Sequence, residues 1–282
     1  MKKQYFVILS IIISICCVTG KNGFAATVGN ALDLDVPQRS AVLRQQMIEN
    51  TLDEYEQIVK IKTSLELEVV FDKDLHVTDE LSKAELKGQW CTAKFGMTIF
   101  NRVEPYVKIG TSNLEVNWKH GGQEMEVDAK EGFAWGGGLK ANILEFQGIR
   151  LTGDAQYRTT EPDVATISVN NSSVSDSGKF KVNEWQAGLF LSKKFEIPLK
   201  LQSIYTVPYA GLVYSDSNVD VSFYNADYPT TDYSLFDANN KKCYGFVLGC
   251  DIVPSLSSAF SYCVELRLVD EIALSLGGTM KF

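Results

Sequence analysis

Histidine is the side chain best suited to moving protons near neutral pH, and this chain of 282 residues contains only two, His76 and His120. A hydrolytic site would need one of them beside a serine, a second histidine or an acid. His76 is followed by Val77 and Thr78, and His120 by two glycines. Neither setting supplies a recognisable partner, so we predict no catalytic residues.

Metal and cofactor chemistry is also weakly indicated. The four cysteines that follow residue 25 match no zinc spacing: Cys91, Cys243, Cys250 and Cys263. Disulfides among them stay open, because pairing cannot be deduced from spacing alone. The triple glycine at 136–138 lies in a strand pattern rather than before a helix, which favours close packing over phosphate binding. We expect no metal and no cofactor.

Charged residues follow a much more regular pattern than the histidines and cysteines. Seven acids and seven bases occupy the polar side of segments that alternate between polar and apolar residues. An enclosed space must balance its buried charges, whereas a water-facing surface need not. We therefore predict a paired network that lines a lumen, formed by Glu66, Glu68, Lys94, Lys108, Lys140, Arg150, Asp154, Arg158, Glu184, Lys194, Asp251, Glu265, Arg267 and Glu271.

Strands must position these charges, and a period of two persists from residue 64 to the end of the chain. About ten segments have it, with eight or twelve as alternatives: 64–71, 86–100, 105–116, 132–143, 148–158, 180–193, 200–214, 243–253, 258–268 and 271–282. Short links alternate with long polar connections at 72–85, 117–131, 159–179 and 215–242. The pattern predicts an all-β fold, a closed antiparallel up-and-down transmembrane β-barrel over 64–282. A soluble exported β-sandwich is the alternative.

Two segments disturb the alternation. In 105–116 the apolar parity changes near Ser112, which we interpret as a bulge or a slip of the strand. In 200–214, Ile204 and Tyr205 compete for the same face. The last run, EIALSLGGTMKF, alternates without a break and ends on Phe282.

Aromatic residues on the apolar faces gather near the strand ends. Those near the long connections are Phe133, Trp135, Tyr157, Trp185 and Tyr244, and those near the short turns are Phe100, Phe195, Phe260 and Phe282. Two aromatic belts are typical of proteins that cross a membrane with strands. The apolar faces are therefore expected to contact lipid.

The N-terminus has the features of an export signal. Lys2 and Lys3 precede an uncharged run at 4–18, and Gly23 and Ala25 suit a cleavage site, so we predict a signal peptide over 1–25. A membrane-anchoring helix is the alternative. Cleavage would remove three lysines and change the formal charge from −8 to −11, which disfavours nucleic acid as a partner.

Residues 26–63 are expected to form a periplasmic segment with one amphipathic helix at 36–60. Asp35 can cap this helix and Pro37 suits its first turn. Its apolar residues recur at roughly helical spacing: Leu43, Met47, Leu52, Tyr55 and Val59. The helix can lie against the rim of the barrel or a partner, or act as a plug in the lumen.

Several short stretches, PYVKIG (105–110), GIRLTGDAQYR (148–158), PYAGLVY (208–214) and LSLGGTMKF (274–282), give the chain a likeness to a known class. With the export signal, residues 64–282 resemble small bacterial outer-membrane barrels of the outer-membrane protein A and Opa-adhesin type. The resemblance implies outer-membrane lipid and lipopolysaccharide as surroundings. It also implies recognition of the last strand, ending in Phe282, by the barrel-assembly machinery. The strand count is also similar to that of omptin proteases, but their His–Asp pair and acidic pair cannot be assigned here.

The four long connections together carry a net charge of −10, nearly all of the excess negative charge of the exported chain. The segment SFYNADYPTTDYSLFDANN within 215–242 is rich in tyrosine, asparagine and aspartate, which suits an extracellular ligand or a divalent cation. We expect a non-enzymatic structural or surface-recognition protein. A narrow cation-preferring channel is the first alternative, and an outer-membrane hydrolase is the second.

Overall fold

The computed structural model describes residues 59–282 apart from 78–80, 175–177, 200–202, 225–231 and 256–257. The predicted signal peptide and most of the predicted helix at 36–60 lie outside the described residues. Val59 and Lys60 already belong to a strand, so the predicted helix boundary at residue 60 is wrong. No helix in the described part of the chain is long and apolar enough to cross a bilayer.

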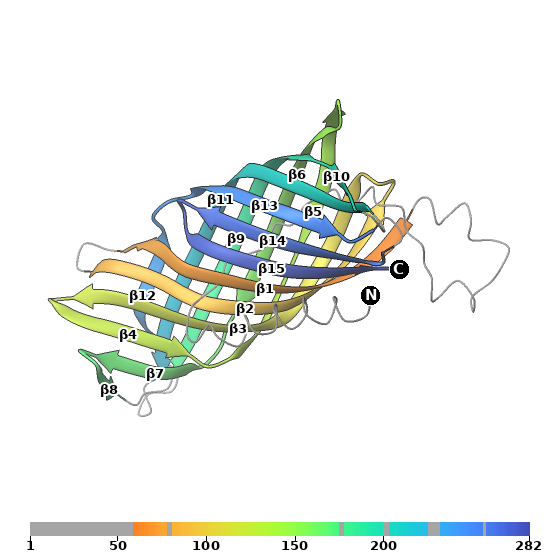
Figure 1. Cartoon of the computed structure of the whole chain (residues 1–282). Coiled ribbons are helices and arrows are strands. Elements are labelled where there is room, and N and C mark those ends of the chain that lie inside the picture. The colour runs from red at the N-terminus through yellow and green to blue at the C-terminus, as the bar shows by residue number, and fades with distance from the viewer. Residues whose placement is uncertain (1–58, 78–80, 175–177, 200–202, 225–231, 256–257) are drawn as a thin grey trace, which may run out of the picture.

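Ten strands form a closed antiparallel barrel, which confirms the predicted fold class. They are β1 (Val59–His76), β2 (Leu81–Ile99), β3 (Val103–His120), β5 (Gly132–Phe146), β6 (Ile149–Thr160), β9 (Gly178–Lys193), β11 (Ser203–Tyr224), β13 (Tyr244–Val253), β14 (Phe260–Leu268) and β15 (Ile272–Lys281). Each of the ten predicted segments corresponds to one of these strands. β15 pairs back onto β1, with Ser64 opposite Thr279 and Val69 opposite Leu274, which closes the ring (Figure 1).

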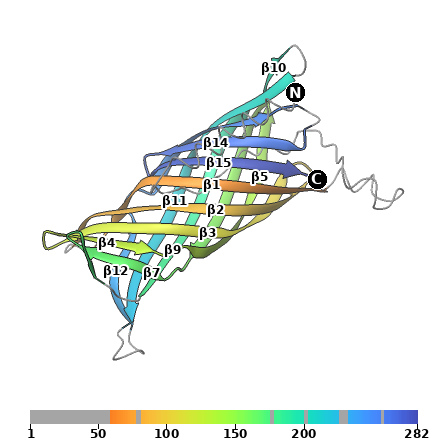
Figure 2. The ribbon, with the colours of Figure 1, turned by 60° about the horizontal axis from the view of Figure 1, so that its bottom comes forward.

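Five shorter strands extend this ring: β4 (Gln123–Ala129), β7 (Val164–Val169), β8 (Ser172–Val174), β10 (Phe195–Pro198) and β12 (Asp232–Asn240). β4 pairs with β3 and β7, β8 pairs with β7, and β12 pairs with both β11 and β1. Figure 2 shows β4, β7 and β12 together at one end of the molecule, opposite the end that holds the C-terminus. We call β4, β7, β8 and β12, with the adjoining ends of β1, β2, β3, β9 and β11, the β-extension.

The β-extension continues the barrel with a different set of strands. A bridge between Asp163 and Lys179 joins the segment before β7 to β9. The neighbours around the extension are therefore β1, β2, β3, β4, β7, β9, β11 and β12. β4 and β7 replace β5 and β6, and β12 replaces β13, β14 and β15. The prediction of long polar loops at 72–85, 117–131, 159–179 and 215–242 is thus wrong, because most of their described residues are strand.

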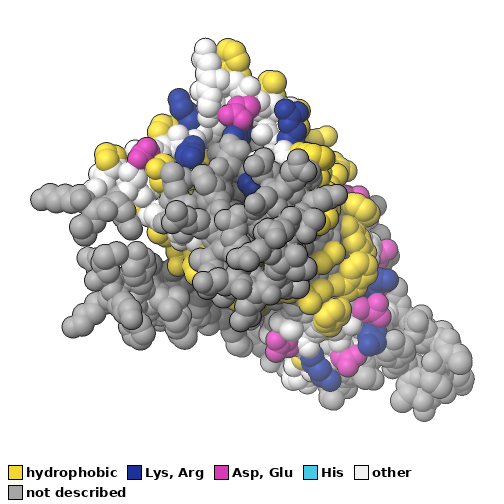
Figure 3. Space-filling view, turned by 90° about the vertical axis from the view of Figure 1, so that its right-hand side faces the viewer, with side chains coloured by type: hydrophobic (Ala, Val, Ile, Leu, Met, Phe, Trp, Pro, Cys, Tyr) yellow, Lys and Arg dark blue, Asp and Glu magenta, His cyan; other side chains and the backbone are white. Residues whose placement is uncertain are grey.

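The outer face of the ten-strand barrel is apolar. Large hydrophobic side chains are exposed on every strand of the ring, among them Leu65, Phe95, Val107, Leu139, Leu189, Leu212, Leu248 and Leu266. Figure 3, which looks onto the end with the C-terminus, shows apolar side chains along the rim of the barrel. Water would disfavour so large an apolar surface, whereas lipid favours it. The barrel therefore spans a membrane. We call the end with the β-extension external and the opposite end periplasmic, because short turns are periplasmic in such barrels.

Strand β3 shows why the β-extension was missed. Its even-numbered residues point inward throughout, and no register shift occurs near Ser112. Lys108 and Ser112 are buried polar residues, whereas Leu114, Val116 and Trp118 are buried apolar residues. The bulge or slip predicted near Ser112 is thus wrong. The strand leaves the membrane there, so its inner face changes from polar to apolar and its outer face from apolar to polar.

Candidate functional site

The lumen contains nearly all of the charges predicted for it. Thirteen of the fourteen predicted lumen residues are buried: Glu66, Glu68, Lys94, Lys108, Lys140, Arg150, Asp154, Arg158, Glu184, Asp251, Glu265, Arg267 and Glu271. Lys194 is the exception. It is exposed between β9 and β10, with Nζ 4.9 Å from the centre of the Tyr205 ring. The β6–β9 pairing ends one residue earlier, at Lys193, so no neighbouring wall encloses this side chain.

One chain of ion pairs crosses the lumen, and we call it the lumen ladder. Its first half lies on β1, β2 and β3. Lys94 and Lys108 contact Glu66 at 2.5 and 2.8 Å, and Lys108 lies 3.9 Å from Glu68. The guanidinium of Arg158 on β6 then bridges Glu68 at 2.7 Å and Glu184 at 2.6 Å.

The second half of the lumen ladder continues from Glu184. Lys73 contacts Glu184 at 3.2 Å and Glu271 at 3.1 Å. Arg267 contacts Glu271 at 2.9 Å and also pairs with Asp270. β1 and β9, which hold Lys73 and Glu184, lie on opposite sides of the ring, so these side chains meet across its centre. Cross-lumen contacts of this kind leave no wide aqueous pore at this level.

Sequence reasoning missed five buried charges that complete the set: Lys62, Lys73, Glu104, Asp270 and Lys281. Lys73, Glu104 and Asp270 fall in stretches that were predicted to be connections. With them, the buried charges of the described residues are nine acids and nine bases. Lys62, for example, pairs with Glu104 at 2.7 Å near the periplasmic end. A balanced set in which opposite charges meet is the arrangement in which buried charge is tolerated.

Two tyrosines fill part of the remaining lumen by lying against glycines. The hydroxyl of Tyr106 donates to Asp154 at 3.0 Å, and that of Tyr209 donates to Glu265 at 2.6 Å. A Cβ at Gly138 would lie 2.4 Å from the Tyr106 hydroxyl. A Cβ at Gly249 would lie 2.1 Å from the Tyr209 ring. Both rings therefore need a neighbour without a side chain, which explains Gly138 of the triple glycine by packing.

An apolar core fills the β-extension directly above the lumen ladder. We call it the external core, formed by Val69, Leu75, Ala84, Leu86, Trp90, Leu114, Val116, Trp118, Val127, Ala129, Ala134, Val164, Ile167, Phe180, Val182, Val219, Val221, Phe236 and Ala238. Trp118 and Phe236 are in ring contact at 4.7 Å between centroids. A gap of about 10 Å³ separates Leu86, Leu114 and Val182 from Arg158 and Glu184, which leaves room for about one water molecule.

The predicted aromatic residues face outward on the barrel. Phe133, Trp135, Trp185 and Tyr244 are exposed at the external end, and Phe282 is exposed at the periplasmic end. Tyr157 is half-buried between Trp135 and Trp185, with ring centroids 5.9 and 4.8 Å away. Tyr214, which was not predicted, forms a further ring pair with Tyr244 at 5.4 Å. These rings lie where the outer surface changes from apolar to polar, as expected for a membrane interface.

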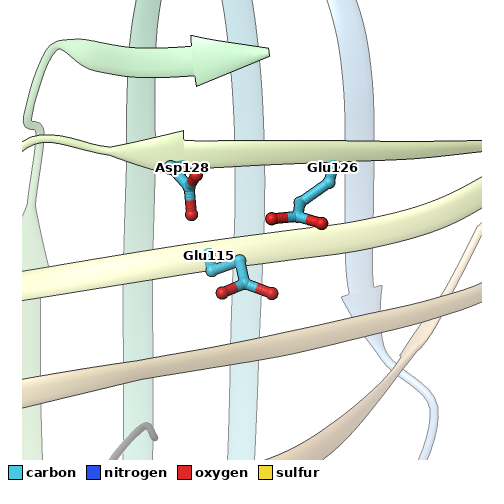
Figure 4. A group of neighbouring side chains, drawn as sticks. All are labelled: Glu115, Glu126 and Asp128. Carbon is cyan, nitrogen blue, oxygen red and sulfur yellow. The ribbon is translucent and has the colours of Figure 1, made fainter. Parts of the chain in front are cut away.

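The outer face of the β-extension is polar and rich in acids. Glu115, Glu126 and Asp128 lie on the neighbouring strands β3 and β4, with carboxylate oxygens within 4.8 Å of one another, and Figure 4 shows them close together. A surface hollow of about 250 Å³ adjoins them, lined in part by Asn117 and Glu126. Exposed acidic groups of this kind are common in proteins that bind no ion.

Exposed ion pairs fasten neighbouring segments of the β-extension. Lys179 contacts Asp163 at 2.8 Å, and this hydrogen bond holds the pKa of the Asp163 carboxyl below its ordinary value. The hydrogen bond from Lys119 likewise lowers the pKa of Glu124. Both pairs join adjacent segments, so they contribute to the order of the extension rather than to a reactive site.

The remaining candidates for chemistry are dispersed. His76 and His120 are exposed at the ends of β1 and β3, and neither forms an ion pair with an acid in the described part of the chain. Cys91, Cys243, Cys250 and Cys263 are free. The stretch 215–242 is a hairpin of β11 and β12 whose tip, 225–231, lies outside the described residues. None of these groups forms a catalytic pair among the residues that the structure describes.

No protein-family model matches the sequence, and no curated protein matches it. Solved barrels are similar in fold. The transport unit of the autotransporter AIDA-I from Escherichia coli is 10% identical, with 89% of this chain and 97% of that chain covered and a TM-score of 0.41. The outer membrane protease OmpT from Escherichia coli is 9% identical over 84% and 97%, with a TM-score of 0.43. The toluene transporter TbuX from Ralstonia pickettii is 10% identical over 92% and 94%, with a TM-score of 0.36.

At these identities no activity transfers to this chain. The physical features of the chain itself decide its class: a closed antiparallel barrel, an apolar outer belt with interfacial aromatic residues, and a polar interior. The chain is an integral outer-membrane β-barrel protein.

Proposed function

We propose that this outer-membrane protein is a non-conducting, non-enzymatic barrel whose β-extension displays an acidic recognition surface outside the cell. The observation that carries the proposal is the external core, which fills the barrel above the membrane with buried apolar side chains. Extended strands over an apolar core make a rigid platform rather than a set of flexible loops. Such a platform suits presentation of a surface more than passage of solute.

The acidic charge at the external end would also suit a cation-preferring channel, which is the main rival. A permeating ion would have to pass both the lumen ladder and the external core. The first contains balanced ion pairs that meet across the lumen, and the second consists of buried apolar side chains, which replace water of hydration poorly. These two barriers in series support a closed barrel.

Conductance across planar lipid bilayers tests the closed state. The full protein should give no steady current in potassium chloride at any salt concentration, and stable cation-selective steps would overturn the proposal. The matched variants Trp118→Ser and Phe236→Ser weaken only the external core. They should also be silent, because the lumen ladder still crosses the lumen.

Surface recognition needs a separate test, for which polylysine serves as a cationic probe. Cells that display the protein should adhere to a polylysine-coated surface more than cells without it, and salt should weaken the difference. The triple variant Glu115→Gln, Glu126→Gln and Asp128→Asn should reduce adhesion. Equal adhesion by both proteins would remove this face from the proposal.

Three partners belong to the proposal. Outer-membrane lipid would contact the apolar belt, and lipopolysaccharide would surround the aromatic residues at the external end. The barrel-assembly machinery would recognise β15 with Phe282. The resemblance in sequence supports the last of these, and the exposed aromatic residues support the first two.

A further inference from the structure

The periplasmic end carries apolar side chains that the barrel wall does not cover. They lie on the β5–β6 hairpin around its turn and on strand β10, and we call them the apolar rim: Ile143, Leu144, Phe146, Ile149, Phe195 and Ile197. Each is between 43% and 65% exposed. Figure 3 shows apolar side chains together with both basic and acidic ones at the top of this end, where these hairpins project.

These tips extend past the strands beside them. β3 pairs with β5 only as far as Ala141, and β6 pairs with β9 only as far as Lys193. β10 pairs with β11 alone among the described strands. Residues 143–146 and 195–198 are therefore hydrogen-bonded to a strand on one side only.

The apolar rim does not lie in the hydrocarbon region of the membrane. Glu145 and Glu196 alternate with its apolar residues and are exposed as well. Carboxylates are costly in the hydrocarbon region, so the tips must reach the water at the periplasmic surface. Apolar side chains of this size in contact with water indicate a protein partner.

We propose that residues 36–58 of the same chain cover the apolar rim as an amphipathic helix. The chain enters β1 at Val59, at the periplasmic end, so this segment leaves the barrel on the correct side. As a helix it would be about 34 Å long, at about 1.5 Å per residue. Half of a ten-strand ring measures about 24 Å, at about 4.8 Å between strands. The segment can therefore reach the tips of β5–β6 and β10.

The chemistry of the segment matches the rim. Its apolar side includes Leu43, Met47 and Tyr55, and its second half contains the acids Glu49, Asp53, Glu54 and Glu56. Exposed Lys193 and Lys194 lie at the base of β10, and Lys193 Nζ is 5.8 Å from the centre of the Phe195 ring. The rim thus offers apolar contacts beside charges of both signs, and Lys193 and Lys194 are the ones that can pair with the acids of the segment.

The lumen is a poorer place for the same helix. The inward residues near its periplasmic mouth include Lys62, Glu104, Arg150 and Lys281, which suit an apolar stripe badly. Farther in, the lumen ladder crosses the centre of the barrel and leaves no room for a helix about 10 Å wide. The rim is therefore preferred to a plug.

Site-specific photo-crosslinking in outer membranes tests the proposal on the full exported chain. Benzoylphenylalanine in place of Ile197 should form an adduct with a peptide from 36–58, located by mass spectrometry. The same probe in place of Leu248, an exposed apolar residue in the middle of the belt, should form no such adduct. The proposal is overturned if position 197 forms no adduct with this segment, or if only a probe in place of lumen-facing Lys62 does.

A pair of matched variants tests the orientation of the helix. Met47→Glu places a carboxylate on the apolar side and should reduce the crosslink from position 197 several-fold. Gln46→Glu places the same group on the polar side and should leave the yield unchanged. Equal yields from both variants would exclude packing through the apolar stripe. The heat-dependent gel shift of the barrel serves to confirm that each variant is folded.

Discussion

Arg158 is the residue whose removal should cost the barrel most. Its guanidinium contacts Glu68 at 2.7 Å and Glu184 at 2.6 Å, and its Cζ lies 4.3 Å from the centre of the Trp90 ring. Arg158→Met keeps much of the volume but leaves two buried carboxylates without their shared cation. Removing one partner of a buried ion pair costs about 3–5 kcal/mol, so we expect the free energy of unfolding to fall by that amount.

The assay is urea unfolding of the barrel in detergent, followed by the fraction that keeps the folded gel mobility. The double variant Arg158→Met with Glu184→Gln should lose less than the sum of the two single variants, because Arg158 and Glu184 contact each other and the second change removes a carboxylate that has lost one of its two cations, Lys73 being the other. Lys87→Met is the control, since Lys87 and Glu85 form a half-exposed pair outside the lumen ladder, and it should be close to wild type. A loss below about 0.5 kcal/mol for Arg158→Met would refute a dry, tightly coupled lumen ladder.

Three further predictions concern other parts of the molecule. Phe236→Ala should destabilise the external core by about 3–5 kcal/mol and expose the β-extension to external protease without loss of the barrel's gel shift, whereas loss of both together would contradict a separate core. Gly249→Ala should cost about 1–3 kcal/mol because its Cβ would overlap the Tyr209 ring, and Gly278→Ala, with nothing within 4 Å, should be neutral in the same urea assay. Because its pairing with Lys179 lowers the pKa of Asp163, the stabilisation it gives is present above the ordinary carboxylate pKa of about 4 and is lost as the pH falls through the lowered value. Limited proteolysis should therefore show the segment around Asp163 loosening only in acid, and Asp163→Asn should reduce that dependence, while the Lys119–Glu124 pair keeps its own.

The sequence predicts the membrane-spanning part well, because alternation of side chains is a direct consequence of strand geometry. Glu68 and Tyr244, for example, are correctly assigned to the inner and outer faces of the wall from the alternation alone. The alternation shows which residues share a face of the strand. It does not show whether that face meets lipid, water or the interior of the protein. In β3 the change near Ser112 marks the membrane surface, and the same signal was interpreted as a bulge.

Lys73 illustrates the second limit of parity. It lies in a stretch that is polar in sequence, DKDLH, yet its Nζ joins Glu184 and Glu271 across the lumen. β1 pairs irregularly with β2 between Val70 and Lys73. The irregularity shifts the parity, so the inward position of Lys73 follows from the pairing and not from the alternation. The prediction for Lys194 is wrong for a different reason. The alternation places this residue on the inner face, but the neighbouring strand has already ended, so nothing encloses its side chain.

The pairing of β12 with β1 sets an order of folding. Leu75 lies opposite Asn240, so this contact joins parts of the chain separated by 165 residues. Contacts so distant in sequence form slowly, because a long loop must close before they contribute stability. Until β12 meets β1, the side chains that will form the external core, Trp118 and Phe236 among them, have no complete cover. The closure of the ring by β1 and β15 joins residues still farther apart, so we expect the β-extension to fold late, together with that closure, and the unassembled chain to depend on periplasmic chaperones more than a barrel with plain polar loops would.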